Sequence, residues 1–311
     1  MHIMQKGALS DVRVLELAGL APAPFCGQIL ADLGADVIRI DKAIPDESSI
    51  IEDALARGKR SIAINTKTDK GVKLVKRLVK SAHVLIDPYR PGVLEHKMGL
   101  GPMELLGVNP KLVIARISGF GQNDGKWKNK AGHDINFVAL SGLLSRFTPH
   151  DSNKPVVPLN LLGDFAAGSL LGVIGILAAL REGNGKVVDV SMTHGLGYLA
   201  TFVWRNWMGV SGKIPGRSAD EAASVVGKDD EKGWLEGRFG GYGVYQTQDG
   251  GFMAVGALEP KFFTKLLQVL DLTGVKHDDQ DLRGKIAERF KTKRRDDWEA
   301  LFHNADVAYA V

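Results

Sequence analysis

The chain has 311 residues, of which 44% are hydrophobic and 24% charged, and its formal net charge is +4. This composition predicts an ordinary soluble globular protein, long enough for one large or two unequal domains, and so small a net charge does not indicate nucleic acid as a partner. The single cysteine, Cys26, excludes an internal disulfide and a cysteine-rich metal site, and it fits a reducing compartment.

No segment predicts a membrane partner. Met1–Leu9 lacks the apolar core and the small-residue cleavage site of a secretory signal. The longest apolar run, Phe165–Leu180, is shorter than the roughly 20 residues of a bilayer span and is broken by glycines. This run predicts a buried helix.

The amino-terminal residues predict a βαβ unit. A strand over Val12–Leu17 is followed by a loop over 18–24, a helix over Phe25–Leu33 and a second strand over Asp36–Ile40. The turn after the first strand lacks the G-x-G-x-x-G fingerprint of dinucleotide-binding proteins, so Asp41 cannot be assigned to a ribose and a nicotinamide cofactor is disfavoured.

Strands and helices continue to alternate beyond this unit. The further predicted elements are strands over Ser61–Asn65, His83–Ile86, Lys111–Ser118 and Lys186–Ser191, and helices over Lys70–Ser81, Leu161–Glu182 and His194–Met208. Such alternation predicts an α/β fold with a doubly wound, Rossmann-like parallel sheet. The lysines of the Lys70–Ser81 helix lie opposite its valines and leucines, which indicates a solvated face.

The composition changes at Gly209. The residues that follow contain many glycines and charged side chains, and they show no sustained helical or strand period. We therefore expect a large domain over 1–208, a linker over 209–240 and a smaller α+β domain over 241–311. Two strands around Asp249-Gly250 predict a hairpin, because Asp-Gly accepts positive φ. Pro260 then opens a helix, and Glu259 before it is a cap or a site residue.

Basic residues stand at strand ends or in the loops beside them. Open parallel sheets bind ligands in the crevice outside the carboxyl ends of their strands. Any one of these residues alone indicates surface charge, but five converging on one crevice would suit phosphates. The five are Arg39, Arg57, Lys59, Arg60 and Arg90.

Two polar segments each place a titratable side chain beside glycine and apolar sequence. Ala131–Phe137 contains His133, and Leu159–Gly168 contains Asp164. Such surroundings would hold a proton-transfer group dry and shift its pKa. Taken alone, His133 is also compatible with a hydrogen-bonded turn residue, and Asp164 with a helix cap.

Five segments together resemble family III CoA-transferases, and within that family the racemase branch that acts on 2-methylacyl-CoA. They are Val12–Asp41, Tyr89–Val93, Ala131–Asp134, Leu161–Phe165 and Val255–Pro260, and the match runs on to Glu299. The resemblance implies the family III CoA-transferase fold over nearly the whole chain.

The resemblance also implies roles for four site residues. Racemisation of a 2-methylacyl thioester removes the proton α to the carbonyl and returns it from the other face, so it needs two opposed bases. By similarity these are His133 and Asp164. Glu259 would hold the imidazole of His133, and the backbone N–H of Asp134 would donate to the enolate oxygen. No metal is needed.

Coenzyme A contacts follow from the same resemblance. Arg39 would lie against the adenine, and three basic residues would lie near the 3′-phosphate or the pyrophosphate: Arg57, Lys59 and Arg60. Tyr89 and Arg90 would line the same crevice, and Lys97 stands where the family often has arginine. No separate cofactor is implied, because coenzyme A is part of the acyl-CoA substrate.

Two positions depart from the racemase pattern. Gly237–Tyr242 replaces a segment that usually resembles Gly-Gly-Ala-Pro before paired tyrosines, which would change the acyl pocket. His194 stands where an acidic residue is common.

Three functions are compatible with these residues. The first is racemisation or epimerisation of a branched acyl-CoA, which His133 and Glu259 favour. The second is CoA transfer, in which Asp164 attacks the thioester as a nucleophile; no glycine-rich loop over the acyl site is evident between Gly209 and Gly240, which disfavours it. The third is a truncated, inactive CoA-binding homologue.

The resemblance implies a homodimer, interlocked through a carboxyl-terminal segment beyond Val311. A chain that ends there would expose apolar surface and dimerise less stably. It also implies an intracellular enzyme of lipid, fatty acid or bile acid metabolism, cytoplasmic in a bacterium and mitochondrial or peroxisomal in a eukaryote.

Overall fold

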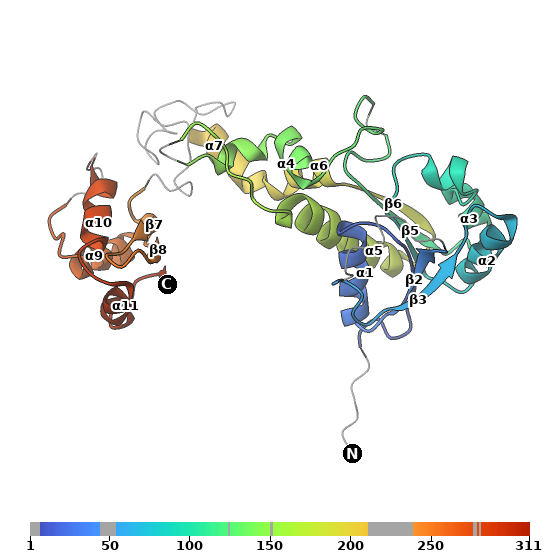
Figure 1. The fold of residues 1–311 in the computed structure, drawn as a ribbon, viewed down its shortest axis with the longest axis horizontal. Helices are drawn as coiled ribbons and strands as arrows, with labels where there is room; N and C mark the ends of the chain where they lie inside the picture. The colour runs from blue at the N-terminus through green and yellow to red at the C-terminus, as the bar shows by residue number, and fades with distance from the viewer. Residues whose placement is uncertain are drawn as a thin grey trace, which may run out of the picture. The chain divides into compact units, whose positions relative to one another are not determined.

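The structure is a computed structural model that describes residues 7–43, 54–123, 125–149, 152–210, 239–275, 279 and 281–311. The chain divides into two compact units (Figure 1). The first comprises Met1–Leu144 and Val157–Leu199, and the second comprises Ser145–Val156 and Ala200–Val311. The predicted linker over 209–240 lies almost entirely outside the described residues, so the predicted domain boundaries stay predictions.

A six-stranded parallel sheet forms the centre of the first unit. The strands are β1 (Arg13–Leu17), β2 (Asp36–Lys42), β3 (Arg60–Ile64), β4 (Val84–Asp87), β5 (Val113–Ser118) and β6 (Lys186–Ser191). Their order is β3-β2-β1-β4-β5-β6, with every neighbouring pair parallel. The order reverses between β1 and β4, which is the point where doubly wound sheets bind ligands. The predicted fold class is confirmed.

Helices cover both faces of this sheet (Figure 1). The helices of the first unit are α1 (Pro22–Asp32), α2 (Asp69–Val79), α3 (Pro102–Val108), α4 (Asp134–Leu140), α5 (Leu171–Glu182) and α6 (Met192–Leu199). One core packs Leu30 of α1 and Ile176 of α5 on one face of the sheet. The other core packs Val75 of α2 and Leu105 of α3 on the opposite face. Both faces of the sheet carry apolar side chains, because helices cover both of them.

Two helix predictions are corrected. Helix α1 begins at Pro22, inside the predicted loop, because proline lacks an N–H that the first helical turn would leave unbonded. The single predicted helix over His194–Met208 divides at Ala200 into α6 and α7 (Thr201–Val210). Glycine and threonine near the junction have weak helix propensity. The helical spacing of apolar residues across the junction was therefore not enough to keep one continuous helix.

The apolar stretch Leu161–Glu182 is helical, as predicted, but it has two parts. Leu161–Leu170 is a π-helical segment, η4, and α5 continues from it. By length and composition alone this stretch could cross a membrane. It packs against α1, α6 and the sheet, as the core helix of a globular unit does, while Leu170 and Ile174 remain exposed. The prediction of a buried helix is therefore correct for one side only.

The second unit contains a three-stranded antiparallel sheet and helices. The strands are β7 (Tyr242–Gln246), β8 (Phe252–Gly256) and β9 (Tyr309–Ala310), and the helices beside them are α9 (Pro260–Val269), α10 (Leu282–Phe290) and α11 (Arg295–His303). The predicted hairpin is β7 and β8, which pair in antiparallel register. Fully buried Trp298 donates its indole N–H to the carbonyl of Phe290 at 2.8 Å, which joins α11 to α10 within this unit's core.

Candidate functional site

The two polar segments meet at a buried carboxylate in the first unit. Asp134 is the first residue of α4 and is 4% exposed. One of its carboxylate oxygens, Oδ2, accepts the backbone N–H of Gly163 at 2.6 Å and of Asp164 at 2.8 Å. A Cβ atom at Gly163 would lie 2.9 Å from this oxygen, so glycine lets the two chains approach. The start of α4 is thereby attached to η4.

Asp164 is the fourth residue of η4 and is partly buried. Burial raises its pKa, and the nearby charge of Asp134 raises it further. The Asn160 amide donates to Asp164 at 3.4 Å and, with the charge of His133, lowers that pKa in part. Asp164 does not cap the helix, because η4 begins three residues earlier. His133 and Asp164 are therefore close enough to interact electrostatically.

His133 precedes α4 in extended backbone conformation, and its side chain is exposed. Its backbone N–H donates to the side-chain oxygen of Asn136 at 3.0 Å, and its carbonyl accepts the N–H of Asn136 at 2.9 Å. The N–H and the carbonyl of His133 therefore both form hydrogen bonds with Asn136 at the start of α4. As the first helical residue, Asp134 has an N–H without an intrahelical acceptor, which leaves it suitable to donate to an enolate oxygen.

Glu259 belongs to the second unit, immediately before α9. Its carbonyl accepts the N–H groups of Phe262 and Phe263, both at 2.9 Å, whereas its carboxylate is exposed and does not cap α9. The side chain is thus not used by its own helix. Its predicted contact with the His133 imidazole stays a prediction.

The first turn of α1 packs against η4. The hydroxyl of Ser169 lies 2.7 Å from the carbonyl oxygen of Pro22 and 3.1 Å from that of Asp164. The rings of Phe25 and Phe165 have their centroids 4.8 Å apart. The position of η4 therefore depends on the position of this turn.

Beneath α1 lies a buried ion pair that the sequence did not predict. The ammonium of Lys59 donates to the Glu16 carboxylate and to the Pro24 carbonyl, each at 2.7 Å. The two side chains are 2% and 0% exposed. Burial raises the pKa of Glu16 to about 7, although Lys59 opposes this, and burial lowers the pKa of Lys59. The carboxylate occupies the space where a side chain at Gly27 would lie.

The structure does not bring the five predicted basic residues to one crevice. Arg60 begins β3, and its guanidinium pairs at 2.5 Å with Asp36, which begins β2. Arg57 pairs at 2.5 Å with Asp32, the last residue of α1. Since α1 returns from the carboxyl edge of the sheet, both arginines lie at the amino edge. The prediction treated all strand ends alike, whereas only carboxyl ends form the crevice.

Tyr89 follows β4 at the carboxyl edge, beside the switch point. Its hydroxyl donates to the carbonyl of Ala18, just beyond β1, at 3.2 Å. Arg90 beside it is exposed, as is Lys97. Arg39 lies within β2 and forms an ion pair with Asp41 at 2.9 Å. Of the predicted CoA residues, these four extend from the middle of β2 to the carboxyl edge.

A buried charge network at the carboxyl edge has no counterpart in the predictions. Arg116 of β5 donates to Asp87 at 3.0 Å and to Glu95 at 2.6 Å. Burial raises the pKa of Asp87 to about 6. Glu95 belongs to η2 (Val93–Lys97), so the network attaches the segment that carries Lys97 to the sheet. Nothing in the local sequence distinguishes Arg116 from a surface arginine.

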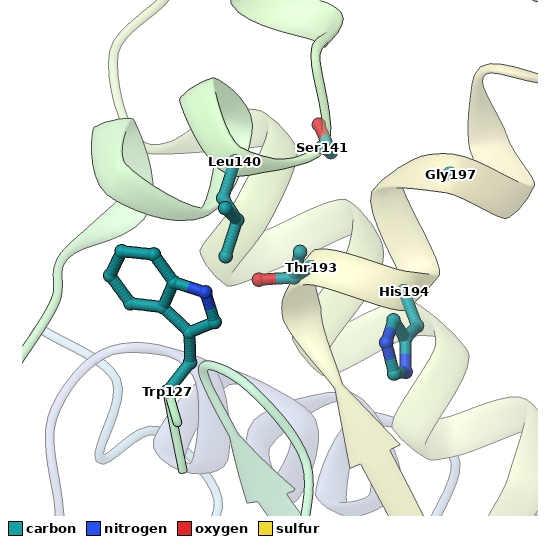
Figure 2. A pocket seen from close by; sticks show the side chains of 6 residues that line it. All are labelled: Trp127, Leu140, Ser141, Thr193, His194 and Gly197. Atoms are coloured by element: carbon teal, nitrogen blue, oxygen red, sulfur yellow. The ribbon is translucent and has the colours of Figure 1, made fainter. Parts of the chain in front are cut away.

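A hollow of about 450 Å³ lies between the end of α4 and α6 (Figure 2). Leu140 and Thr193 point into the space beside the indole of Trp127, and His194 lies farther along. The other lining residues are Ser141 and Gly197. This hollow is at the opposite end of α4 from His133. It is therefore not the place where the predicted proton transfer would occur.

Within the described ranges, no group of three or more His, Cys, Asp and Glu side chains is arranged to hold a metal ion. The expectations that the reaction uses no metal and no separate cofactor stay predictions.

The chain is similar to known proteins along nearly its whole length. A sequence profile described as CoA-transferase family III matches residues 9–311. Alpha-methylacyl-CoA racemase of Mus musculus is 43% identical over 311 residues, which cover 96% of this chain and 76% of that protein. The Homo sapiens protein of the same name is 39% identical with the same coverage. The crystal structure of a CAIB/BAIF family protein from Brucella suis matches with a TM-score of 0.78 at 26% identity, covering 99% of this chain and 84% of that one.

Proposed function

Because the chain belongs to CoA-transferase family III, as its sequence resemblance predicted, we propose that it is an isomerase that racemises or epimerises 2-methyl-branched acyl-CoA thioesters. The two relatives named alpha-methylacyl-CoA racemase support the substrate class. The observation that carries the proposal is that Asp134, which follows His133 in the chain, accepts the backbone N–H of Asp164 at 2.8 Å and so brings the two segments together.

The reaction needs one base on each side of the α-carbon. One base removes the α-proton, the electrons move into the thioester carbonyl to form an enolate, and the other base returns a proton to the opposite face. We assign these roles to His133 and Asp164. The raised pKa of Asp164 suits it, since a partly desolvated carboxylate is a stronger base than a solvated one.

The enolate oxygen needs a donor that is fixed before the reaction. The N–H of Asp134 fits this role, because it stands at the first position of α4 and the Asp134 side chain is held in place by two backbone donors. Glu259, whose carboxylate its own helix does not use, would orient the imidazole of His133.

Coenzyme A would lie along the carboxyl edge of the sheet near the switch point. The residues that support this position are Arg39, Tyr89, Arg90 and Lys97. Of these, Arg90 and Lys97 offer exposed cations to phosphate groups. The buried network around Arg116 would keep Lys97 in position.

A second function is CoA transfer, favoured by the partly exposed carboxylate of Asp164 and by the family's name. There, an oxygen of Asp164 would bond to the thioester carbonyl carbon, the C–S bond would break, and CoA thiolate would leave behind a mixed anhydride. The thiolate would then attack the Asp164 carbonyl carbon of the anhydride, which releases the donor acid and leaves CoA as a thioester on Asp164. The carboxylate of an acceptor acid would attack this thioester, and the released thiolate would take the acceptor acyl group from the new anhydride, which restores the Asp164 carboxylate.

Incubation with a 2-methylacyl-CoA in heavy water distinguishes the two functions. Racemisation incorporates deuterium at the α-carbon and equalises the two epimers. Transfer instead yields an acyl adduct on Asp164, detectable by its mass, and moves CoA to an added carboxylate. An adduct without α-deuterium would decide for transfer.

We further propose a homodimer and an intracellular location. The exposed apolar side chains Leu170 and Ile174, one helical turn apart, support a self-association surface on the first unit. Sedimentation velocity of the 311-residue chain tests the dimer.

A further inference from the structure

We propose that Lys59 is a positioning residue of the active site and not a ligand of the CoA phosphates. Its buried ammonium fixes the first turn of α1, and this turn supports η4, the segment that carries Asp164. The role in turnover rests on the proposed racemase function, whereas the structural role does not.

The first contact joins Lys59 to α1. Its ammonium donates at 2.7 Å to both the Pro24 carbonyl and the Glu16 carboxylate. Pro24 is the third residue of α1, so this bond attaches the start of the helix to β1 and to the chain before β3. The charged groups that influence Glu16 are Lys59, Arg39 and Asp41.

The second contact joins that turn to η4. Pro22, two residues before Pro24, has its carbonyl oxygen 2.7 Å from the Ser169 hydroxyl, which is also 3.1 Å from the carbonyl oxygen of Asp164. Phe25 packs on Phe165, directly after Asp164, with ring centroids 4.8 Å apart. The ammonium of Lys59 is therefore linked to the backbone of Asp164 by three contacts: its bond to the Pro24 carbonyl, and the contacts of the Ser169 hydroxyl with the carbonyl oxygens of Pro22 and Asp164.

Burial separates this role from phosphate binding. Only 2% of the Lys59 side chain is exposed, and its ammonium already contacts a carboxylate and a carbonyl. A phosphate ligand needs an ammonium that solvent and ligand can reach. Contact with a phosphate would require Lys59 to leave Glu16 as a buried, unpaired charge.

Cys26 supplies a direct probe of this support. It is the chain's only cysteine, it lies in α1 two residues after Pro24, and it is 0% exposed. Its thiol reacts with an added disulfide reagent only when the start of α1 opens. The experiment compares the wild type with Lys59→Met, with the double variant Glu16→Gln/Lys59→Met, and with Lys73→Met, which removes an exposed lysine of α2 as a matched control.

We expect Lys59→Met and the double variant to label about 10- to 100-fold faster than the wild type, the range for loss of a charged hydrogen bond. Lys73→Met should label at the wild-type rate. The double variant leaves no buried unpaired charge, so it keeps the test valid if the single variant fails to fold. Labelling that is insensitive to low denaturant reports local opening of α1 and not global unfolding. Wild-type labelling in a folded double variant would overturn the proposal.

Kinetics of α-deuterium exchange separate positioning from binding. A positioning residue predicts a kcat lowered about tenfold in the double variant, with the KM for the CoA ester and its salt dependence unchanged. A raised KM that loses its salt dependence, together with unchanged labelling, would instead assign Lys59 to phosphate binding. If the wild type exchanges no deuterium, the racemase proposal fails while the labelling result still decides the structural role.

Discussion

The carboxylate of Asp134 accepts the backbone N–H of Asp164 at 2.8 Å, so a buried side chain sets the distance between the segments that carry the two proposed bases. His133 precedes Asp134 in the chain, and Asp164 follows Gly163, whose N–H the same oxygen accepts at 2.6 Å. Two separable functions are therefore proposed for Asp134: its N–H would donate to the enolate oxygen, and its side chain holds η4.

Replacement of Asp134 separates these functions. Asp134→Ala keeps the backbone N–H of residue 134 but leaves the N–H groups of Gly163 and Asp164 without their acceptor, so we expect kcat for α-deuterium exchange to fall about 10- to 100-fold. Asp134→Asn retains a carbonyl oxygen and should lose less. Asp69→Ala, at the exposed start of α2, is the control. Wild-type exchange by Asp134→Ala would show that η4 is held by other contacts.

The pH dependence of exchange should report on Asp164. The carboxylate must be ionised to remove a proton, and burial raises its pKa above the ordinary value of 3.8. On acidification, the rate of exchange from the epimer that Asp164 deprotonates should therefore fall. This fall should occur at a higher pH than it would for an aspartate with the ordinary pKa. Asn160→Ala removes a donor that lowers this pKa, so the acid limb should move to still higher pH. If Asn160→Ala instead moved the acid limb of the pH–rate profile to lower pH, Asp164 would not be the base that this limb reports.

Stereochemistry distinguishes the two bases. Each base serves one face of the α-carbon, so His133→Ala should abolish initial exchange from one epimer more than from the other, by about 100-fold or more. Asp164→Asn should show the opposite preference. Initial rates from the separate epimers, followed by mass spectrometry, provide the measurement. Equal losses from both epimers in both variants would exclude a two-base mechanism.

The two edges of the sheet give a matched test of CoA binding. Arg90→Ala removes an exposed cation at the carboxyl edge and should weaken acyl-CoA binding about two- to fivefold at low salt, the range of an exposed ion pair. The loss should shrink as salt rises. Arg60→Ala, at the amino edge and paired with Asp36, should leave affinity unchanged. Equal weakening by both variants in titration calorimetry would place the phosphates elsewhere.

The stability of the protein should depend on pH through Glu16. Its pKa is raised from 4.5 to about 7, so the folded protein binds this proton more tightly than the unfolded chain does. The resulting stabilisation is complete below about pH 4.5 and is lost as pH rises through about 7. Relative to Glu16→Gln, the wild type should lose up to about 3 kcal/mol of unfolding free energy across this window. Urea melts at several pH values test this, with Glu288→Gln as an exposed control.

Local sequence predicted the parallel strands and the hairpin because their causes are local, whereas it did not predict the helices α4, α10 and α11. Alternating strand and helix patterns gave all six parallel strands, and Asp-Gly gave the hairpin of β7 and β8. The start of α1 was misplaced because Pro22 and Pro24 favour both loops and first helical turns, and only packing on η4 decides between them.

The site was predictable to the extent that its residues stand in motifs. His133, Asp134 and Asp164 stand in segments quoted for the family resemblance, and the structure brings the two segments together. Lys59 and Arg60 are adjacent in sequence, yet one is buried beneath α1 and the other exposed at the amino edge. The charge of a residue and its position along a strand do not reveal which face or edge of the sheet its side chain reaches. That depends on the partners that β1 and β2 provide, and these strands are distant in sequence.

The packing of Glu16 against Gly27 limits how this sequence can diverge. Any side chain at position 27 meets the Glu16 carboxylate, and Glu16 in turn needs the cation of Lys59. A side chain at position 27 therefore creates a clash, loss of Glu16 leaves the buried ammonium of Lys59 without its carboxylate, and loss of Lys59 leaves a buried carboxyl group without its partner. These positions should vary together among homologues: where glutamate at 16 is replaced by a small apolar residue, position 27 is free to gain a methyl group and position 59 to lose its charge.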